Sequence, residues 1–484
     1  MKMIIIKNKI KITLCVLALA LALIQTSCIG PSIINRTENK KVPVNYGSNN
    51  SDTINVANMN WRKYFNDQNL ICLIDTALKN NQELNIVMQE INIAKNEVRA
   101  KKGAYIPMLD VGIETGVHKP GKYTIEGATE EANDIVTGKK NPDPMSNYGF
   151  GANISWEVDI WGKLRNAKKA AVNKYLASID GKNFMVTNLI SEIANSYYEL
   201  LALDNQLEIL KTNIKIYQNS LEIVKLEKIA ARTTELAVRR FEAEVLKNQS
   251  KQFYIEQEII KTENEINFLL GRFPQKINRD TTNFLNFQLD SIHSGVPTQL
   301  LENRPDIKQA ERELTATKLE VKSTKAEFYP ALKITAGAGY GAFNPKYIIE
   351  TPLSIVYNLA GNLVAPLINR NAIKANYFNA SSKQLQAMYN YERSILNAHV
   401  EVANQISNIG NLKKSFELKA RQTQTLTESI EISKTLYKSA RADYMEVLLT
   451  QRDALDSKIE LIETKKQQFH ARVNLYKALG GGWK

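Results

Sequence analysis

The sequence carries the same arrangement twice, and this duplication limits the possible folds more than any other feature. Residues 78–84 resemble residues 301–307 at an offset of 223 (301 − 78), and residues 192–195 match 401–404 at an offset of 209 (401 − 192). The offsets differ by 14 (223 − 209), so the first copy holds about 14 extra residues, which fit the polar, turn-rich segment 121–147. We therefore expect a fold built from two similar halves.

Each copy has the same predicted order of elements. A helix ends at an aromatic-x-Pro, two strand-like segments follow, and a very long helical stretch comes next. Proline is absent from residues 145–273 and from 367–484, and proline breaks helix interiors. The 69 residues from Gly162 to Ala231 (231 − 162) would extend roughly 100 Å as one helix, at about 1.5 Å per residue.

These helical stretches have the spacing of coiled coils. Apolar residues recur in steps of three and four, which is an a/d stripe with a 3.5-residue period. A second row seven residues apart predicts contact with neighbours on two sides: Ile209, Ile216 and Ile223. The first stripe consists of Leu200, Leu203, Leu207, Leu210, Ile214, Tyr217, Leu221 and Val224, and a similar one of Leu455, Ile459, Ile462, Phe469, Val473 and Tyr476.

The strand-like segments alternate in polarity. In residues 148–160 the even positions are mostly apolar, whereas the odd ones include Gly, Asn, Ser, Glu and Asp, and residues 354–367 show a similar alternation. Segments of about ten residues with one apolar face suit a transmembrane β-barrel, and a soluble sandwich is the alternative. Four strands cannot close in lipid, because edge N–H and C=O groups would lack partners. Two copies would give eight strands and three would give twelve, and the pattern alone leaves both open.

The N-terminus has the features of a secretory leader. A lysine-bearing start precedes the apolar run 12–24, which suits a signal peptide. The following Gln-Thr-Ser-Cys28 resembles a bacterial lipobox, in which the cysteine is cleaved free and lipidated. An ordinary signal peptide is the alternative. Cys72 would then be the one remaining thiol, so no internal disulfide is expected, and we predict it to be a small buried hydrophobe.

Composition argues against several classes of function. The net charge is +13, yet no dense basic patch interleaved with aromatic residues is apparent, so we expect no nucleic-acid partner. Four histidines occur, none in a zinc motif, so we predict no metal site, no cofactor and no catalytic residues. Residues 116–122 have the spacing of a phosphate loop but lack its Ser or Thr. The protein is therefore expected not to be an enzyme.

Several local motifs together resemble those of the TolC-like outer-membrane efflux family, in its lipoprotein (NodT/OprM-like) branch. The match, in the order and spacing of these motifs, covers essentially the whole mature chain. The motifs are Leu-Leu-Glu-Asn-Arg-Pro-Asp-Ile at 300–307, Phe-Tyr-Pro-Ala-Leu at 328–332, Leu-Leu-Gly-Arg-Phe-Pro at 269–274, Tyr-Lys-Ser-Ala-Arg-Ala-Asp-Tyr-Met-Glu-Val-Leu at 437–448 and Ala-Leu-Gly-Gly-Gly-Trp at 478–483.

The resemblance implies an α+β membrane protein with an internal two-fold repeat. Long antiparallel coiled-coil helices would form a periplasmic α-barrel, and four strands per protomer would contribute to a 12-stranded β-barrel in a homotrimer. The chain would then be the passive outer-membrane channel of a tripartite efflux system, lipid-anchored and extending into the periplasm. Its partners would be outer-membrane lipid, a periplasmic adaptor and an inner-membrane pump of RND or ABC type. A periplasmic adaptor and a structural coiled-coil lipoprotein are the alternatives.

The repeat and the resemblance predict a division into five segments. They are a signal peptide at 1–27, a lipid-anchored N-terminal segment with equatorial residues at 28–70, a first repeat at 71–271 with a hairpin at about 105–160, an inter-repeat equatorial linker at 272–300, and a second repeat at 301–484 with a hairpin at about 329–368.

The resemblance also implies a functional site where paired helices turn, at the periplasmic tips. There adaptor hairpins dock and the pore closes, and relatives often have Gly at the positions of Ala231 and Ala440. Glu446 matches the place of an acidic gate residue, which would attract cations and form bridges to Arg or Tyr. Solvated helix-end residues are the alternative. The candidates are Ala231, Arg232, Thr233, Tyr437, Ala440, Arg441, Asp443 and Glu446.

Overall fold

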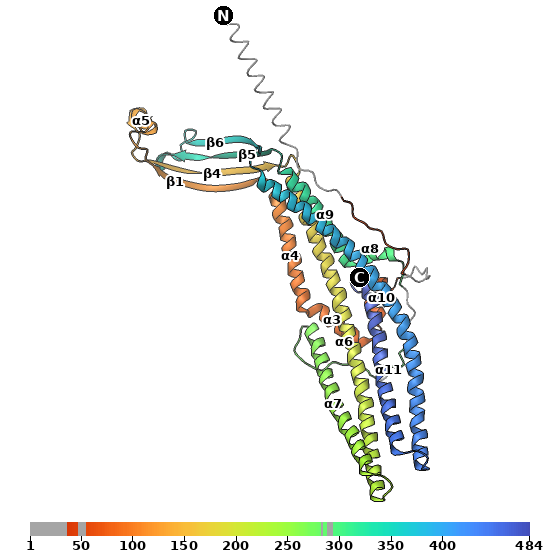
Figure 1. The fold of residues 1–484 in the computed structure, drawn as a ribbon. Coiled ribbons are helices and arrows are strands. Elements are labelled where there is room, and N and C mark those ends of the chain that lie inside the picture. The colour runs from red at the N-terminus through yellow and green to blue at the C-terminus, as the bar shows by residue number, and fades with distance from the viewer. Residues whose placement is uncertain (1–35, 47–54, 282–283, 288–293) are drawn as a thin grey trace. The chain divides into compact units, whose positions relative to one another are not determined.

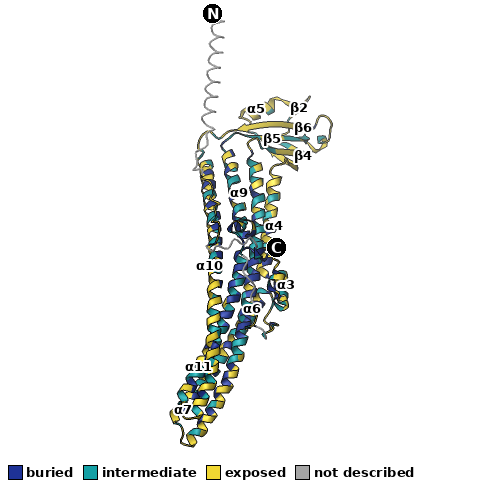
Figure 2. Ribbon diagram, turned by 90° about the vertical axis from the view of Figure 1, so that its right-hand side faces the viewer, coloured by how far each residue is buried: buried dark blue, intermediate teal, exposed yellow. Residues whose placement is uncertain are grey.

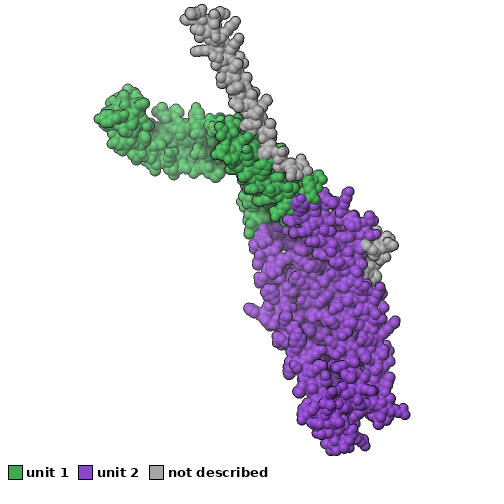
Figure 3. Space-filling view, in the orientation of Figure 1, with its two compact units in different colours: residues 1–37, 92–176, 312–388 green, residues 38–91, 177–311, 389–484 purple. Residues whose placement is uncertain are grey.

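The computed structural model describes residues 36–46, 55–281, 284–287 and 294–484. The predicted signal peptide and Cys28 lie outside these ranges. The chain divides into two compact units: unit 1 contains residues 92–176 and 312–388, and unit 2 contains residues 38–91, 177–311 and 389–484 (Figure 3).

Unit 1 holds a four-stranded antiparallel sheet (Figure 1). Its strands are β1 (Met108–His118), β4 (Met145–Val158), β5 (Ala331–Ala342) and β6 (Ile355–Val364), paired in the order β1-β4-β5-β6. The two predicted hairpins are therefore present, and β4 pairs with β5 to join them into one sheet. Because β1 and β6 are the outer strands, each has one edge without a partner strand in the described chain.

The alternating sequence gives the sheet two different faces. Val111, Ala152, Ala338 and Tyr357 are successive partners across the four strands, so they share one apolar face. Val111 and Tyr357 are 80% and 83% exposed, although both are large apolar side chains. The adjacent row, on the opposite face, is polar or small: Asp110, Asn153, Gly337 and Asn358.

The extra residues of the first copy form a small folded loop at the far end of the sheet. It contains α5 (Ile125–Ala132) and a ribbon of β2 (Asp134–Val136) and β3 (Lys139–Lys140). The Thr124 hydroxyl accepts a hydrogen bond from the Gly127 N–H and so caps α5. Gly127 is required here, because a Cβ at this position would lie 2.3 Å from the Gly121 carbonyl oxygen.

The two halves contain helices of nearly equal length. In the first half α4 (Gln82–Gly103), α6 (Lys163–Ile229) and α7 (Glu235–Leu269) have 22, 67 and 35 residues. Their counterparts α9 (Pro305–Ala326), α10 (Asn371–Lys438) and α11 (Tyr444–Ala478) have 22, 68 and 35. The long helical stretch expected after Gly162 is present, and α6 runs through it as one continuous helix. None of the helices in the described part of the chain combines the length and the apolar character that crossing a membrane requires.

Shorter elements complete unit 2. They are η1 (Val56–Asn58), α2 (Trp61–Phe65), α3 (Gln68–Asn80), η2 (Pro297–Gln299) and α8 (Leu300–Asn303), while η3 (Pro345–Tyr347) belongs to unit 1.

The core of unit 2 follows the predicted stripes. In the first stripe, on α6, Leu200, Leu210 and Tyr217 are at most 1% exposed. Figure 2 shows buried residues along α6. Lys466, which interrupts the second stripe, forms ion pairs with Glu199 at 2.9 Å and Glu463 at 2.8 Å.

The prediction for Cys72 was wrong. Its thiol lies on the exposed side of α3, because the helix buries the stripe Leu70, Leu73, Ile74 and Ala77 instead. Those residues are spaced by three and four, and Cys72 falls between two members of the stripe.

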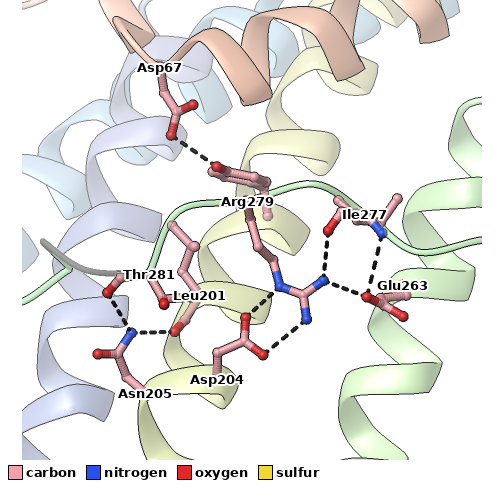
Figure 4. Close-up of polar contacts among 9 residues, drawn as sticks. Asp67, Leu201, Asp204, Asn205, Glu263, Ile277, Arg279 and Thr281 are labelled. Carbon is pink, nitrogen blue, oxygen red and sulfur yellow. Dashed lines mark hydrogen bonds and ion pairs between the residues drawn. The ribbon is translucent and has the colours of Figure 1, made fainter.

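The inter-repeat linker is fixed to the helices by Arg279 (Figure 4). Its Nη2 donates to Asp204 Oδ1 of α6 at 3.0 Å, its Nη1 pairs with Glu263 of α7, and the same Nη1 donates to the Ile277 carbonyl at 2.9 Å. The side chains of Arg279, Asp204 and Glu263 are 15–19% exposed. This guanidinium therefore joins three segments that are distant in sequence.

Arg304 of the Arg-Pro-Asp motif makes a comparable junction in the second half. It pairs with Asp306 at 2.7 Å and Glu401 at 2.6 Å, and it donates to the Ala478 carbonyl at 2.9 Å. The residue is 4% exposed. The motif therefore has a structural role, which is to join the start of the second half to α10 and to the end of α11.

Candidate functional site

The candidate site consists of two helical turns in unit 2, named here tip 1 (residues 230–234) and tip 2 (residues 439–443). In tip 1 the Arg232 N–H bonds the Glu227 carbonyl at 2.8 Å, and the Ala231 N–H bonds the Lys228 carbonyl at 3.0 Å. The bond from Arg232 to Glu227 is the six-to-one bond of a Schellman turn. Such a turn needs a residue with left-handed backbone conformation directly after the helix. Ala231 fills that position with φ of 54°.

Tip 2 repeats the geometry of tip 1. The Arg441 N–H bonds the Leu436 carbonyl at 2.9 Å, and Ala440 has φ of 50°. Alanine is uncommon in this region because its Cβ approaches the backbone. The tight turns expected at Ala231 and Ala440 are therefore present, although neither residue is glycine.

The helix after each turn starts with a side-chain cap. The Thr234 hydroxyl accepts from the Ala237 N–H at 3.4 Å, and the Asp443 carboxylate accepts from the N–H groups of Met445 and Glu446 at 2.6 and 3.2 Å. Both are standard N-cap residues. Asp443 therefore caps α11, a structural role that the sequence did not predict for this candidate gate residue.

A hydrogen bond joins the two helices that lead into the tips of a single chain. The Tyr437 hydroxyl of α10 donates to the Glu227 carboxylate of α6. Partial burial first, and then this bond to Glu227, raise the pKa of Tyr437 to about 12. The neutral hydroxyl, which is the form that donates, is thus the stable form at physiological pH.

Further contacts join the helices that follow the turns. The Arg240 guanidinium of α7 contacts the Met445 thioether of α11. Behind it, Val238 and Phe241 of α7 and Leu448 of α11 belong to one buried cluster. The helices at the two tips of one chain are therefore held together by an apolar core, with the Tyr437–Glu227 hydrogen bond and the Arg240–Met445 contact beside it.

The structure brings only some of the predicted residues together. Ala231, Arg232, Ala440 and Arg441 are exposed, and Thr233 is partly buried. Glu446 is exposed, and Tyr437 bonds Glu227 rather than Glu446. Sequence reasoning missed Glu227, because nothing in the local pattern of α6 marks it as the partner of a residue 210 positions away.

One group of possible metal-ligating atoms appears elsewhere, at the far end of the sheet. Donor atoms of His118, Glu126 and Glu130 lie within 4.8 Å of one another. His118 Nε2 lies 3.4 Å from Glu126 Oε1. The group is largely exposed, and an ion pair between the imidazole and the carboxylate is sufficient to account for it.

Comparison with known proteins decides the family. The profile of the family described as outer membrane efflux protein matches residues 73–272 and 296–481. The chain belongs to this family. It is 25% identical over 446 residues to the cation efflux system protein CusC of Escherichia coli O6:H1, covering 91% of this chain and 93% of CusC. It is 27% identical over 424 residues to the solvent efflux pump outer membrane protein SrpC of Pseudomonas putida, covering 87% of each.

Solved structures of such proteins have the same fold. A crystal structure of CusC superposes with a TM-score of 0.81 at 24% identity, covering 93% of this chain and 99% of that one. The outer-membrane channel OprN superposes with a TM-score of 0.83 at 20% identity, covering 94% and 99%. The protein is therefore an outer-membrane efflux component. The predicted family and outer-membrane location are confirmed.

Proposed function

We propose that three copies of this chain assemble into one passive duct whose wall in the outer membrane is a closed 12-stranded barrel. The observation that carries this proposal is the sheet of unit 1, which has an exposed apolar face, a polar face and two edges that pair with no strand of the described residues. In lipid, unpaired edge groups are prohibitively costly, so the edges need other copies as partners. Twelve strands leave room for a channel, whereas eight are filled by their own side chains.

The helical part would line the path on the periplasmic side. Exposed apolar residues on α6, such as Ile216 and Ile223 at 38% and 56%, belong to the second predicted row. We assign them to contacts between copies, because coiled-coil helices with two apolar rows pack against two neighbours. The near-equal helix lengths also support the division into repeats at 71–271 and 301–484.

The tips would form the periplasmic mouth, where an adaptor docks and the passage closes. The bond between Tyr437 and Glu227 adds to the apolar core that holds the two hairpins of one copy together, so its release would favour their separation. Glu446, exposed in the first turn of α11, would place three carboxylates around the mouth of a trimer. Such a ring attracts cations.

The duct would need partners, because it has no energy source of its own. Relatives at 25–27% identity are named for efflux of cations and of solvents, and one at 26% for pyoverdine export. Such varied cargo among similarly distant relatives favours a conduit whose cargo is selected by a periplasmic adaptor and an inner-membrane pump. Lipidation of Cys28 would anchor the mature chain, and loss of palmitate labelling in Cys28→Ala tests this.

The deciding experiment is reconstitution of the full mature chain in planar bilayers, with its mass measured in parallel by native mass spectrometry. We expect a trimer and discrete channels. Glu446→Gln should lower the preference for cations. The matched control is Glu242→Gln, an acid of α7 whose side chain is 43% exposed. A monomeric protein without conductance would refute the duct, whereas an unchanged reversal potential in Glu446→Gln would refute only the role of that residue.

A further inference from the structure

The positive charge of the chain is concentrated beside the sheet. The four parts of unit 1 that adjoin the strands on the helical side are residues 92–107, 159–176, 312–330 and 365–388. Together they contain 16 Lys and Arg but only five Asp and Glu, whereas the whole chain has 63 and 50. These segments therefore account for a surplus of 11 positive charges out of the net +13.

All four segments meet the sheet at the same end. Strand β1 starts and β4 ends there, with Met108 paired to Ser155, and β5 starts where β6 ends, with Ala331 paired to Val364. The opposite end, beyond His118 and Met145, carries the folded loop. The surplus positive charge therefore lies at one end of the sheet and is not spread evenly over the protein surface.

The acids in these segments do not neutralise the surplus. Glu97, Asp159 and Glu320 are paired with Lys101, Arg165 and Lys174 at 3.3, 3.1 and 2.5 Å. Among the exposed lysines of these segments that make no ion pair with the described residues, five lie within 11 residues of a strand. We call them the basic collar: Lys102, Lys169, Lys322, Lys325 and Lys374.

Exposed apolar and aromatic side chains lie between the collar and the strands. Ile106, Ile160 and Ile368 are 57%, 49% and 90% exposed. Trp161 is 50% exposed, its indole N–H donates to the Pro330 carbonyl at 2.8 Å, and its ring stacks on Tyr329 with centroids 4.8 Å apart. Anchored Trp and Tyr rings are typical of the level where lipid headgroups meet the apolar bilayer interior.

We propose that the basic collar binds the phosphate headgroups of anionic phospholipids in the leaflet on the helical side of the membrane. This inference rests on the proposed function, because it requires the sheet to lie in the bilayer. An aromatic rim sets the depth of insertion, and lysines one or two helical turns beyond it reach the phosphates. Lysines near a membrane surface attract acidic lipid, and salt weakens the attraction.

The test uses the full mature chain in nanodiscs containing brominated phosphatidylglycerol or brominated phosphatidylcholine, and measures quenching of tryptophan fluorescence. Trp156 and Trp161 lie at the helical end of the sheet, so lipid bound there quenches them. We expect phosphatidylglycerol to be enriched about fivefold over phosphatidylcholine at low salt. The variant with Lys102, Lys322, Lys325 and Lys374 all changed to Gln should lower this ratio to about one.

A matched control removes four exposed lysines of unit 2, Lys215, Lys276, Lys413 and Lys414, and should keep the wild-type ratio. Equal quenching by both lipids in the wild type, or an equal loss in both variants, would overturn the collar while leaving the duct in place. A collar variant that alters anion conductance without altering the lipid ratio would also overturn it, in favour of contact with anionic cargo. No quenching by either brominated lipid would instead contradict the proposed function itself.

Discussion

Four helices of unit 2 end in the same backbone turn, but two ends carry glycine and two carry alanine. At the ends of α7 and α11, Gly271 and Gly480 adopt φ of 67° and 87°, and the Arg272 and Gly481 N–H groups make the six-to-one bonds at 3.0 and 2.9 Å. At the tips, Ala231 and Ala440 occupy the equivalent position with φ of 54° and 50°.

The surroundings explain the difference. A Cβ on Gly271 would lie 2.4 Å from the Asn80 carbonyl oxygen, and one on Gly480 would lie 2.6 Å from the Asn303 carbonyl oxygen. The alanines at the tips are exposed, so their methyl groups meet no such obstacle. Packing thus demands glycine where the helices end against other segments. At the tips only intrinsic backbone strain opposes alanine, and the fold tolerates it.

The largest effect should come from Gly480→Ala. The new methyl group would collide with the Asn303 carbonyl in a conformation that alanine already disfavours, so we expect a loss of about 4 kcal/mol in the free energy of unfolding. Urea denaturation followed by circular dichroism would measure it. Gly410→Ala in the middle of α10, where a Cβ meets nothing within 4 Å, is the control and should stabilise by about 0.8 kcal/mol. Similar values for both would contradict the packing explanation.

The second-largest loss of stability should come from replacing the Arg279 side chain. Arg279→Met leaves the carboxylates of Asp204 and Glu263 partly buried without their cation, which should destabilise by about 3 kcal/mol. The control is Arg239→Met. Its partners Glu235 and Glu242 lie at 2.8 and 3.0 Å with side chains 47% and 43% exposed, so this variant should lose about 0.5 kcal/mol or less. Equal losses would mean that burial of the Arg279 network does not matter.

The bond at the tips should matter less for stability than for gating. Tyr437→Phe should cost about 1 kcal/mol and raise single-channel conductance, because a hydrogen bond is lost with little change in packing. The raised pKa of about 12 predicts that the bond persists below pH 10. The stability it contributes is then lost as pH rises from 10 towards 12, because the unfolded chain ionises first. Conductance that is flat over that window in the wild type, as expected for Tyr437→Phe, would refute a gating role for the Tyr437–Glu227 bond.

The smallest effect should be a gain at the alanine turns. Ala231→Gly and Ala440→Gly relieve left-handed strain, and each should stabilise by about 0.5–1 kcal/mol. The change should appear as a higher urea midpoint with an unchanged slope. A loss of stability in either variant would mean that the methyl group makes contacts beyond those at the turn.

The sequence was informative where periodicity carried the signal. The stripe from Leu200 to Val224 and both hairpins could be predicted, because burial on one side imposes a 3.5- or 2-residue repeat. Contacts made by single polar side chains have no period. For that reason Arg279, which reaches Asp204 and Glu263, and Glu227, which accepts from Tyr437, could not be identified. Cys72 was misassigned because its apolar neighbours concealed which side of α3 is buried.

The number of strands contributed by each chain has a consequence for assembly. Along the sheet the strands alternate in direction from β1 to β6, so β6 runs opposite to β1. When copies join around a ring, β6 of one meets β1 of the next, and an even count keeps that junction antiparallel. An odd count would force a parallel pair at every junction. Because of this parity, identical copies related by simple rotation can close one continuous antiparallel wall, with a single type of head-to-tail interface.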